Sequence, residues 1–250
     1  MKVKKNYGEM YLLPSLFSLT NLFFGFLSIQ MSLRGHFRWA AFWIIVAAAM
    51  DGFDGIVARA TKSQSDFGIE LDSLADAISF GAAASVLIFR WGLARAGATG
   101  LFFSFVFLAA GVLRLARYNV RTKSLPDRRF YQGLTVPSAA MFMSAFPLFH
   151  PAPIQSREIA FLFALLAIFV SFCMISTLPY RNITNLVFNR KIDIRTALFL
   201  AIVLSGLVFY PKHFLLVAFS LNALSGPVVA VAWALKRTPR RRSRRKEIPS

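Results

Sequence analysis

The sequence of 250 residues is 56% hydrophobic and only 16% charged, with 27 phenylalanines and a mean hydropathy of +0.56. A soluble domain of this length would be roughly a quarter charged, so the composition argues against an ordinary soluble protein. The net charge of +18 comes from lysines and arginines placed at the ends of apolar runs, which argues against nucleic-acid binding. The chain is therefore predicted to be an all-α, polytopic integral membrane protein.

About eight apolar segments approach or exceed the roughly 18 to 20 residues that a transmembrane helix needs. We predict membrane spans at residues 14–33, 38–60, 69–92, 98–118, 133–149, 157–178, 195–210 and 212–235. Residues 1–235 then form a single membrane domain. Residues 236–250 are rich in lysine and arginine and lack apolar periodicity, which predicts a disordered tail that contacts anionic lipid.

The charge distribution predicts the orientation of these spans. With eight spans, most of the 29 lysines and arginines fall on the side of the N-terminus. The positive-inside rule then places both termini in the cytoplasm. The scattered histidines do not indicate a zinc site, and a single cysteine, Cys173, cannot form an intramolecular disulfide.

Residues 50–76 hold six of the 11 acidic residues, although apolar runs flank this stretch on both sides. Acids within or beside a membrane span are costly, and they are candidates for function by default. Asp51 and Asp54 are spaced i, i+3 and Asp72 and Asp76 are spaced i, i+4, so each pair shares one face of a helix. The short connection over residues 61–68 predicts that the two helices are antiparallel neighbours, whose acid pairs meet.

The two remaining acids, Asp66 and Glu70, are expected at the edge of the loop, with Asp66 or Asp72 as a possible helix cap. Four carboxylates in one site need a positive counter-charge. Oxygen ligands alone favour Mg²⁺, Mn²⁺ or Ca²⁺, as one or two ions.

Small residues and an arginine follow the first acid pair. Gly55 and Ala58 leave open space on the face of the acids, and Arg59 is suited to a phosphate. Together with the acids they predict a metal-bound pyrophosphate as the substrate, because metal sites of this kind support phosphoryl displacement.

This pattern resembles the signature of the CDP-alcohol phosphatidyltransferase family. Its two parts are Asp54-Gly55-x2-Ala58-Arg59 and Gly68-x3-Asp72-x3-Asp76, with Asp51 three residues ahead. The resemblance implies that Asp51, Asp54, Asp72 and Asp76 hold a divalent cation and that Asp76 is also the general base on the acceptor hydroxyl. It further implies that Gly55, Ala58, Arg59 and Gly68 contact CDP and that the protein is a homodimer.

Four longer segments resemble the phosphatidylserine synthase branch of this family: LPSLFSLTNLFFGFLSI, ELDSLADAISFG, RLARYNV and GLTVPSAA. The resemblance implies transfer of the phosphatidyl group from CDP-diacylglycerol to L-serine, which gives phosphatidylserine and CMP. It also implies a bacterial or archaeal cytoplasmic membrane, with the active site on the cytoplasmic face. Asn21 in the first span is assigned to the CDP site, with interhelical hydrogen bonding as the alternative.

The acceptor site is predicted from polar residues near the second acid pair. The carboxylate of serine needs cationic partners, and Arg114, Arg117 and Arg121 share one helical face at the cytoplasmic end of the fourth span. Ser79 and Asn119 are further candidates. Topology, lipid contact or helix capping would also explain the arginines and Asn119.

Other functions are compatible with the same acidic residues. The same family chemistry could use glycerol 3-phosphate, inositol phosphate or choline as the acceptor. A divalent-cation transporter is a distant alternative. Its acids would be expected near the middle of the bilayer and in broken helices, whereas the acids here are predicted near the cytoplasmic ends of the spans. A non-catalytic membrane scaffold is another.

Overall fold

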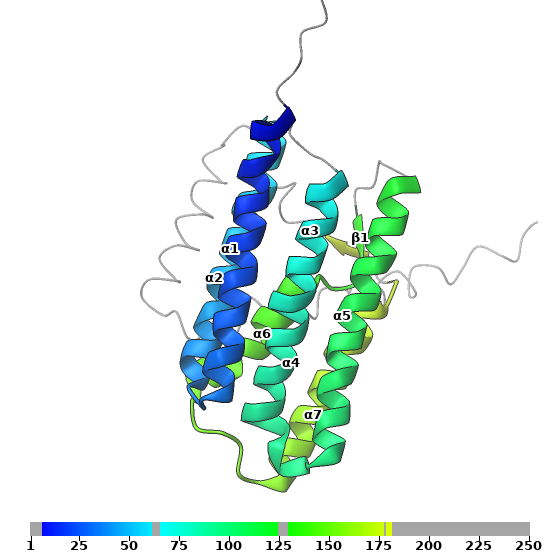
Figure 1. The fold of residues 1–250 in the computed structure, drawn as a ribbon. Helices are drawn as coiled ribbons and strands as arrows, with labels where there is room; N and C mark the ends of the chain where they lie inside the picture. The colour runs from blue at the N-terminus through cyan, green and yellow to red at the C-terminus, as the bar shows by residue number, and fades with distance from the viewer. Residues whose placement is uncertain (1–6, 62–65, 125–129, 178, 182–250) are drawn as a thin grey trace, which may run out of the picture.

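The computed structural model describes residues 7–61, 66–124, 130–177 and 179–181, and these residues form a bundle of helices (Figure 1). The predicted spans at 195–210 and 212–235 and the tail at 236–250 lie outside the described residues. The α-helices of the bundle are α1 Tyr7–Leu33, α2 Phe37–Thr61, α3 Asp66–Asp76, α4 Ala83–Leu87, α5 Ala98–Ser124, α6 Val136–Phe149 and α7 Arg157–Ile175.

In the described part of the chain, four helical stretches are long and apolar enough to cross a membrane. They are Leu16–Leu33, Phe67–Ala96, Ala98–Val120 and Arg157–Ile175. The helix α6 is apolar but has only 14 residues, and α2 has 25 residues but carries charged residues towards its end. The prediction of a helical membrane protein is therefore confirmed, whereas the number of eight spans stays a prediction.

A tight turn at Gly35 joins α1 to α2. Gly35 has φ of 79°, a conformation that costs glycine nothing. The amide of His36 donates to the carbonyl of Met31 at 2.9 Å, and that of Gly35 donates to Ser32 at 3.2 Å, which is the pattern of a Schellman helix end. The turn lays the two helices side by side and antiparallel (Figure 1).

The third predicted span forms one continuous helical stretch from Asp66 to Ala96. Two π-helical segments interrupt its α-helical geometry, η1 at Ala77–Ala82 and η2 at Ile88–Leu93, and a 3₁₀ turn, η3 at Ala94–Ala96, ends it. The first π-helical segment begins directly after Asp76. The sequence predicted the span but not these wide turns, because an apolar run does not distinguish α from π hydrogen bonding.

The all-α prediction omitted one small element. The strand β1, Phe130–Gln132, pairs antiparallel with β2, Pro179–Arg181, and Tyr131 lies opposite Tyr180. Strands of three residues show no alternating pattern in the sequence. They pair because the start of α6 and the end of α7 lie close together: the amide of Leu134 donates to the carbonyl of Cys173 at 3.0 Å.

The core lies where α2, α4, α5 and α6 meet, and the fully buried Ile44, Phe80 and Phe107 fill it. On the other side of the bundle α1 packs against α3, η1 and α4 (Figure 1). This contact is very close at Gly25, where an added Cβ would overlap the main chain and the side chain of Ser79.

The close contact at Gly25 gives a test of the packing of α1. We expect Gly25→Ala to lower the free energy of unfolding by about 1–3 kcal/mol, because the obstructing atoms include backbone and two helices must move apart. The measurement is thermal unfolding in detergent. Gly52→Ala on α2 is the matched control: a Cβ there would meet open space. It should keep or raise stability, since alanine is the better helix former. Equal effects of the two substitutions would contradict the packing described here.

Candidate active site

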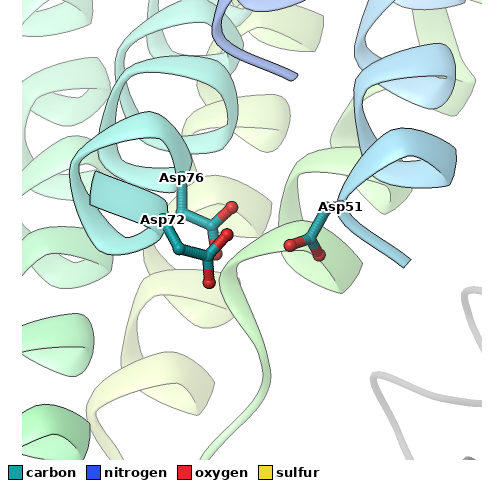
Figure 2. A group of neighbouring side chains, drawn as sticks. All are labelled: Asp51, Asp72 and Asp76. Atoms are coloured by element: carbon teal, nitrogen blue, oxygen red, sulfur yellow. The ribbon is translucent and has the colours of Figure 1, made fainter. Parts of the chain in front are cut away.

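Three carboxylates meet between α2 and α3. Asp72 and Asp76 project from one face of α3 towards Asp51 on α2 (Figure 2). One oxygen from each of the three carboxylates lies within 4.8 Å of the others. Asp76 is buried, and Asp51 and Asp72 are half-buried. The i, i+4 spacing predicted this shared face of α3, and the structure also brings Asp51 to it.

The rest of the predicted donor site lies at the end of α2. Asp54, Gly55, Ala58 and Arg59 all fall within this helix, but their side chains lie outside the part of the chain that the structure describes. The contribution of these four residues to the site therefore stays a prediction. Asp54, three residues after Asp51 on the same helix, is expected to share its face. Gly68 lies in the first turn of α3, one turn before Asp72, where the sequence predicted a helix start.

Asp66 and Glu70 are not loop residues. Asp66 is the first residue of α3, and Glu70 lies one turn further along the helix with an exposed side chain. The helix begins earlier than the sequence predicted, because acids at a helix N-terminus interact favourably with the free amide groups there. Glu70 does not belong to the group of three carboxylates, and the side chain of Asp66 lies outside the part of the chain that the structure describes.

Asp76 is the most enclosed of the three acids, and it has contacts from two other helices. Asn21 Nδ2, on α1, donates a hydrogen bond to Asp76 Oδ1 at 3.1 Å. Arg114, on α5, is only 6% exposed and lies close enough to interact electrostatically with Asp76. The guanidinium of Arg114 also lies over the ring of Tyr118, at 6.0 Å from its centroid.

The other predicted acceptor residues have partners within the protein. The Ser79 hydroxyl donates to the main-chain carbonyl of Asn21 at 3.0 Å, and Asn119 Nδ2 donates to Ser73 Oγ at 2.9 Å. Arg117 donates from its guanidinium to the last carbonyls of α7, at Met174, Ile175 and Ser176. These contacts connect α1 and α5 to the helix of the acids and α5 to the end of α7. The side chain of Arg121 lies outside the described residues.

Two contacts of the site were missed at the sequence level. Asn21 reaches Asp76 across 55 residues, and Ser73 joins Asn119 to the carbonyl of Ile69 through its hydroxyl. The signal for the first was an amide side chain in the middle of an apolar span. A serine such as Ser73 offers no comparable signal, because serines occur throughout these spans.

The arrangement fits a divalent cation. Three carboxylates whose oxygens converge within 4.8 Å repel one another, one of them buried and two half-buried, and a cation would remove this repulsion. Their all-oxygen chemistry suits Mg²⁺, Mn²⁺ or Ca²⁺ rather than a metal that prefers sulfur or imidazole. The group can therefore hold a metal ion beside a phosphate-bearing substrate.

Comparison with known proteins shows similarity to one family over almost the whole chain. The family described as CDP-alcohol phosphatidyltransferase matches residues 11–236. The CDP-diacylglycerol–serine O-phosphatidyltransferase of Helicobacter pylori is 32% identical over 200 residues, which are 78% of this chain and 83% of that protein. The protein of the same name from Bacillus subtilis is 32% identical over 132 residues, 53% of this chain and 73% of that protein.

An archaeal relative is similar to a comparable degree. The archaetidylserine synthase of Methanothermobacter thermautotrophicus is 34% identical over 178 residues, 70% of this chain and 71% of that protein. The family match begins within α1 and covers α2 to α7, including residues 51–76, which carry the aspartates. The predicted resemblance and the assignment as a transferase are confirmed, and the chain belongs to the CDP-alcohol phosphatidyltransferase family.

Proposed function

We propose that this protein transfers the phosphatidyl group of CDP-diacylglycerol to the hydroxyl group of L-serine, which yields phosphatidylserine and CMP. The observation that carries the proposal is the convergence of Asp51, Asp72 and Asp76, because these residues belong to the signature of the family. The names of the three relatives described above all specify serine, which supports serine as the acceptor.

The metal site consists of Asp51, Asp54, Asp72 and Asp76, and it takes one or two ions of Mg²⁺ or Mn²⁺, with Ca²⁺ as the third candidate. Such an ion, when bound, supplies positive charge for the pyrophosphate and polarises the acceptor hydroxyl. The support is the donor chemistry: three of the four carboxylates converge in the described residues.

The donor lies along the end of α2. Gly55 and Ala58 leave the space for CDP, Arg59 binds its phosphates, and Gly68 allows a close approach at the start of α3. The hydroxyl oxygen of serine attacks the phosphorus that carries diacylglycerol, and the bond from this phosphorus to the oxygen of CMP breaks. Asp76 accepts the hydroxyl proton. Its burial fits this role, because a site without bulk water protects the phosphatidyl group from hydrolysis.

The acceptor site is built around Arg114. Its buried guanidinium lies beside Asp76 and can hold the carboxylate of serine near the base. Ser79 and Asn119 complete the walls of the acceptor site, whereas Arg117, first predicted there, supports the site through its bonds to the end of α7. The contacts of Ser79 to Asn21 and of Asn119 to Ser73 hold α1 and α5 around the site.

The protein spans the membrane eight times as one domain of residues 1–235, with both termini and the acid cluster on the cytoplasmic side. The distribution of lysine and arginine supports this orientation. The membrane is the cytoplasmic membrane of a bacterium or archaeon, and the protein is a homodimer. The tail at 236–250 contacts anionic lipid, since it is strongly basic.

The choice of acceptor is tested with the purified protein, CDP-diacylglycerol and Mn²⁺ or Mg²⁺. Radiolabelled serine, glycerol 3-phosphate, inositol phosphate and choline are offered separately, and labelled lipid and CMP are measured. We expect serine alone to give labelled lipid, with one CMP released per lipid formed. Labelled lipid from another acceptor, with none from serine, would overturn the assignment of the acceptor.

The role of Asp76 is tested with Asp76→Asn, which keeps the size of the side chain and removes its charge. We expect the rate of CMP release to fall by about 10²–10⁴-fold, because the general base and one ligand are lost. Glu70→Gln is the matched control, since it removes an exposed acid of the same helix outside the cluster. A full rate in Asp76→Asn, or in the native protein with excess chelator, would contradict the site.

Arg114 and Arg117 of α5 are predicted to differ in their roles. Arg114→Gln should raise KM for serine by about 10-fold or more and change KM for CDP-diacylglycerol little, because a charge-assisted contact to the acceptor is lost. Arg117→Gln should chiefly lower the melting temperature, because three carbonyls of α7 lose their donor. Steady-state kinetics and thermal unfolding of both variants check this. An equal rise in KM for serine without loss of stability in Arg117→Gln would contradict it.

A further inference from the structure

Asn21 is the one fully buried asparagine among the residues of α1 whose side chains the structure describes, and it contacts the proposed base directly. Its side-chain amide is 0% exposed and donates to Asp76 Oδ1 at 3.1 Å. An ionised carboxylate can only accept hydrogen bonds, so this contact requires the NH₂ group of Asn21 to face Asp76. The contact therefore has a defined direction, from α1 to the acid.

A second hydrogen bond holds Asn21 in place from the same helical stretch. The hydroxyl of Ser79, three residues after Asp76, donates to the main-chain carbonyl of Asn21 at 3.0 Å. One turn further along α1, Gly25 allows the backbones to approach closely at Ser79. The side chain of Asn21 thus contacts Asp76 while its main chain is bound by Ser79, and the two bonds fix the position of α1 relative to the acid.

The local backbone makes this support important. Asp76 is the last residue of α3, and the π-helical segment η1 begins at the next residue. A π turn departs from α-helical hydrogen bonding, and such turns occur frequently at functional sites. The α-helical hydrogen bonding on the C-terminal side of Asp76 is therefore interrupted, although Asp76 itself keeps α-helical φ and ψ of −61° and −42°. The contact from α1 adds a constraint on the side chain at this change of helix type.

The side-chain oxygen of Asn21 is also not satisfied in the way expected for a residue whose role is only to stabilise the fold. Of the groups that the structure describes, none donates to Asn21 Oδ1, although this oxygen is buried. A buried acceptor without a donor costs free energy. The amide is therefore oriented so that its NH₂ group binds Asp76, while its oxygen has no donor among the described residues.

We propose that Asn21 is a positioning residue for Asp76 rather than a contact to CDP. Anchoring one carboxylate oxygen fixes the rotation of the group, and this sets the direction of the other oxygen towards the shared site with Asp51 and Asp72. The inference rests on the proposed metal-dependent transfer, in which Asp76 serves as both ligand and base. Loss of the anchor should weaken the metal site and the chemical step while leaving the binding of CDP-diacylglycerol intact.

The test compares three variants of the full chain in detergent. Asn21→Leu has nearly the shape of asparagine without its hydrogen bonds, and Asn21→Gln keeps an amide donor. Ser28→Ala is the matched control, because Ser28 is also buried on α1 and its hydroxyl bonds another helix, at Ala40 O, in the part of α1 that packs against α2. For each, the rise in melting temperature is measured against Mn²⁺ concentration without substrate, together with kcat and KM for CDP-diacylglycerol.

For Asn21→Leu we expect the half-saturating Mn²⁺ concentration to rise about 10-fold and kcat to fall about 10–100-fold, as for the loss of a group that orients a metal ligand. KM for CDP-diacylglycerol, measured at saturating Mn²⁺, should stay within about twofold. Asn21→Gln should recover part of both losses, and Ser28→Ala should show neither. If Asn21→Leu does not fold, Asn21→Gln against Ser28→Ala carries the same comparison, with a smaller loss expected in Asn21→Gln.

Four results would overturn the inference. An unchanged Mn²⁺ response with a raised KM for CDP-diacylglycerol would make Asn21 a substrate contact. Equal losses in Asn21→Leu and Ser28→Ala would show a general structural role. An unchanged Mn²⁺ response and unchanged kinetics would remove any role of the contact. If the native protein itself shows no thermal response to Mn²⁺, the proposed metal site fails, and the inference fails with it.

Discussion

The repulsion between carboxylates held together inside an apolar bundle is the constraint on which the rest of the structure depends. Asp51, Asp72 and Asp76 converge within 4.8 Å although such groups lose much of their hydration there. A single helix can align two acids, but the third must come from a neighbour, so the antiparallel packing of α2 against α3 is part of the site itself. A cation resolves the repulsion, and the same cation is what a pyrophosphate substrate requires. The carboxylates that repel one another are therefore the ones proposed to hold the metal ion for the donor.

The helices around this pair hold it through a small number of polar contacts. Apolar packing alone gives little preference for one helix register over another within a membrane, because lipid is as apolar as the helix surface. Hydrogen bonds between helices supply the register here: α1 through Asn21 and Ser79, and α5 through Asn119 and Ser73. At Gly25 the absence of a side chain allows the backbones to approach closely enough for the bonds of α1 to form.

The sequence predicted the elements governed by local patterns. Apolar runs predicted the helices, and the spacing of Asp72 and Asp76 predicted one shared face on α3. The features that depend on tertiary contacts were not predictable in this way. The pairing of Phe130–Gln132 with Pro179–Arg181 and the partners of Asn21 and Arg117 join segments far apart in the chain. The π turn after Asp76 is local, but an apolar run does not distinguish it from an α turn. The spans proposed at 195–210 and 212–235 lie outside the described residues and stay predictions.

Arg114 and Arg117 show why spacing could not settle the acceptor site. Three residues apart on one helix, they were expected to face one substrate. The last carbonyls of α7 lack helical partners, and the guanidinium of Arg117 satisfies three of them with its rigid fork of donors. Arg114 instead lies buried beside Asp76. Of these two described charges, one is thus used within the fold, and Arg114 is the one of the two that stays available to the proposed acceptor site. A doubly charged phosphate would need several cations, whereas the single carboxylate of serine can be matched by Arg114.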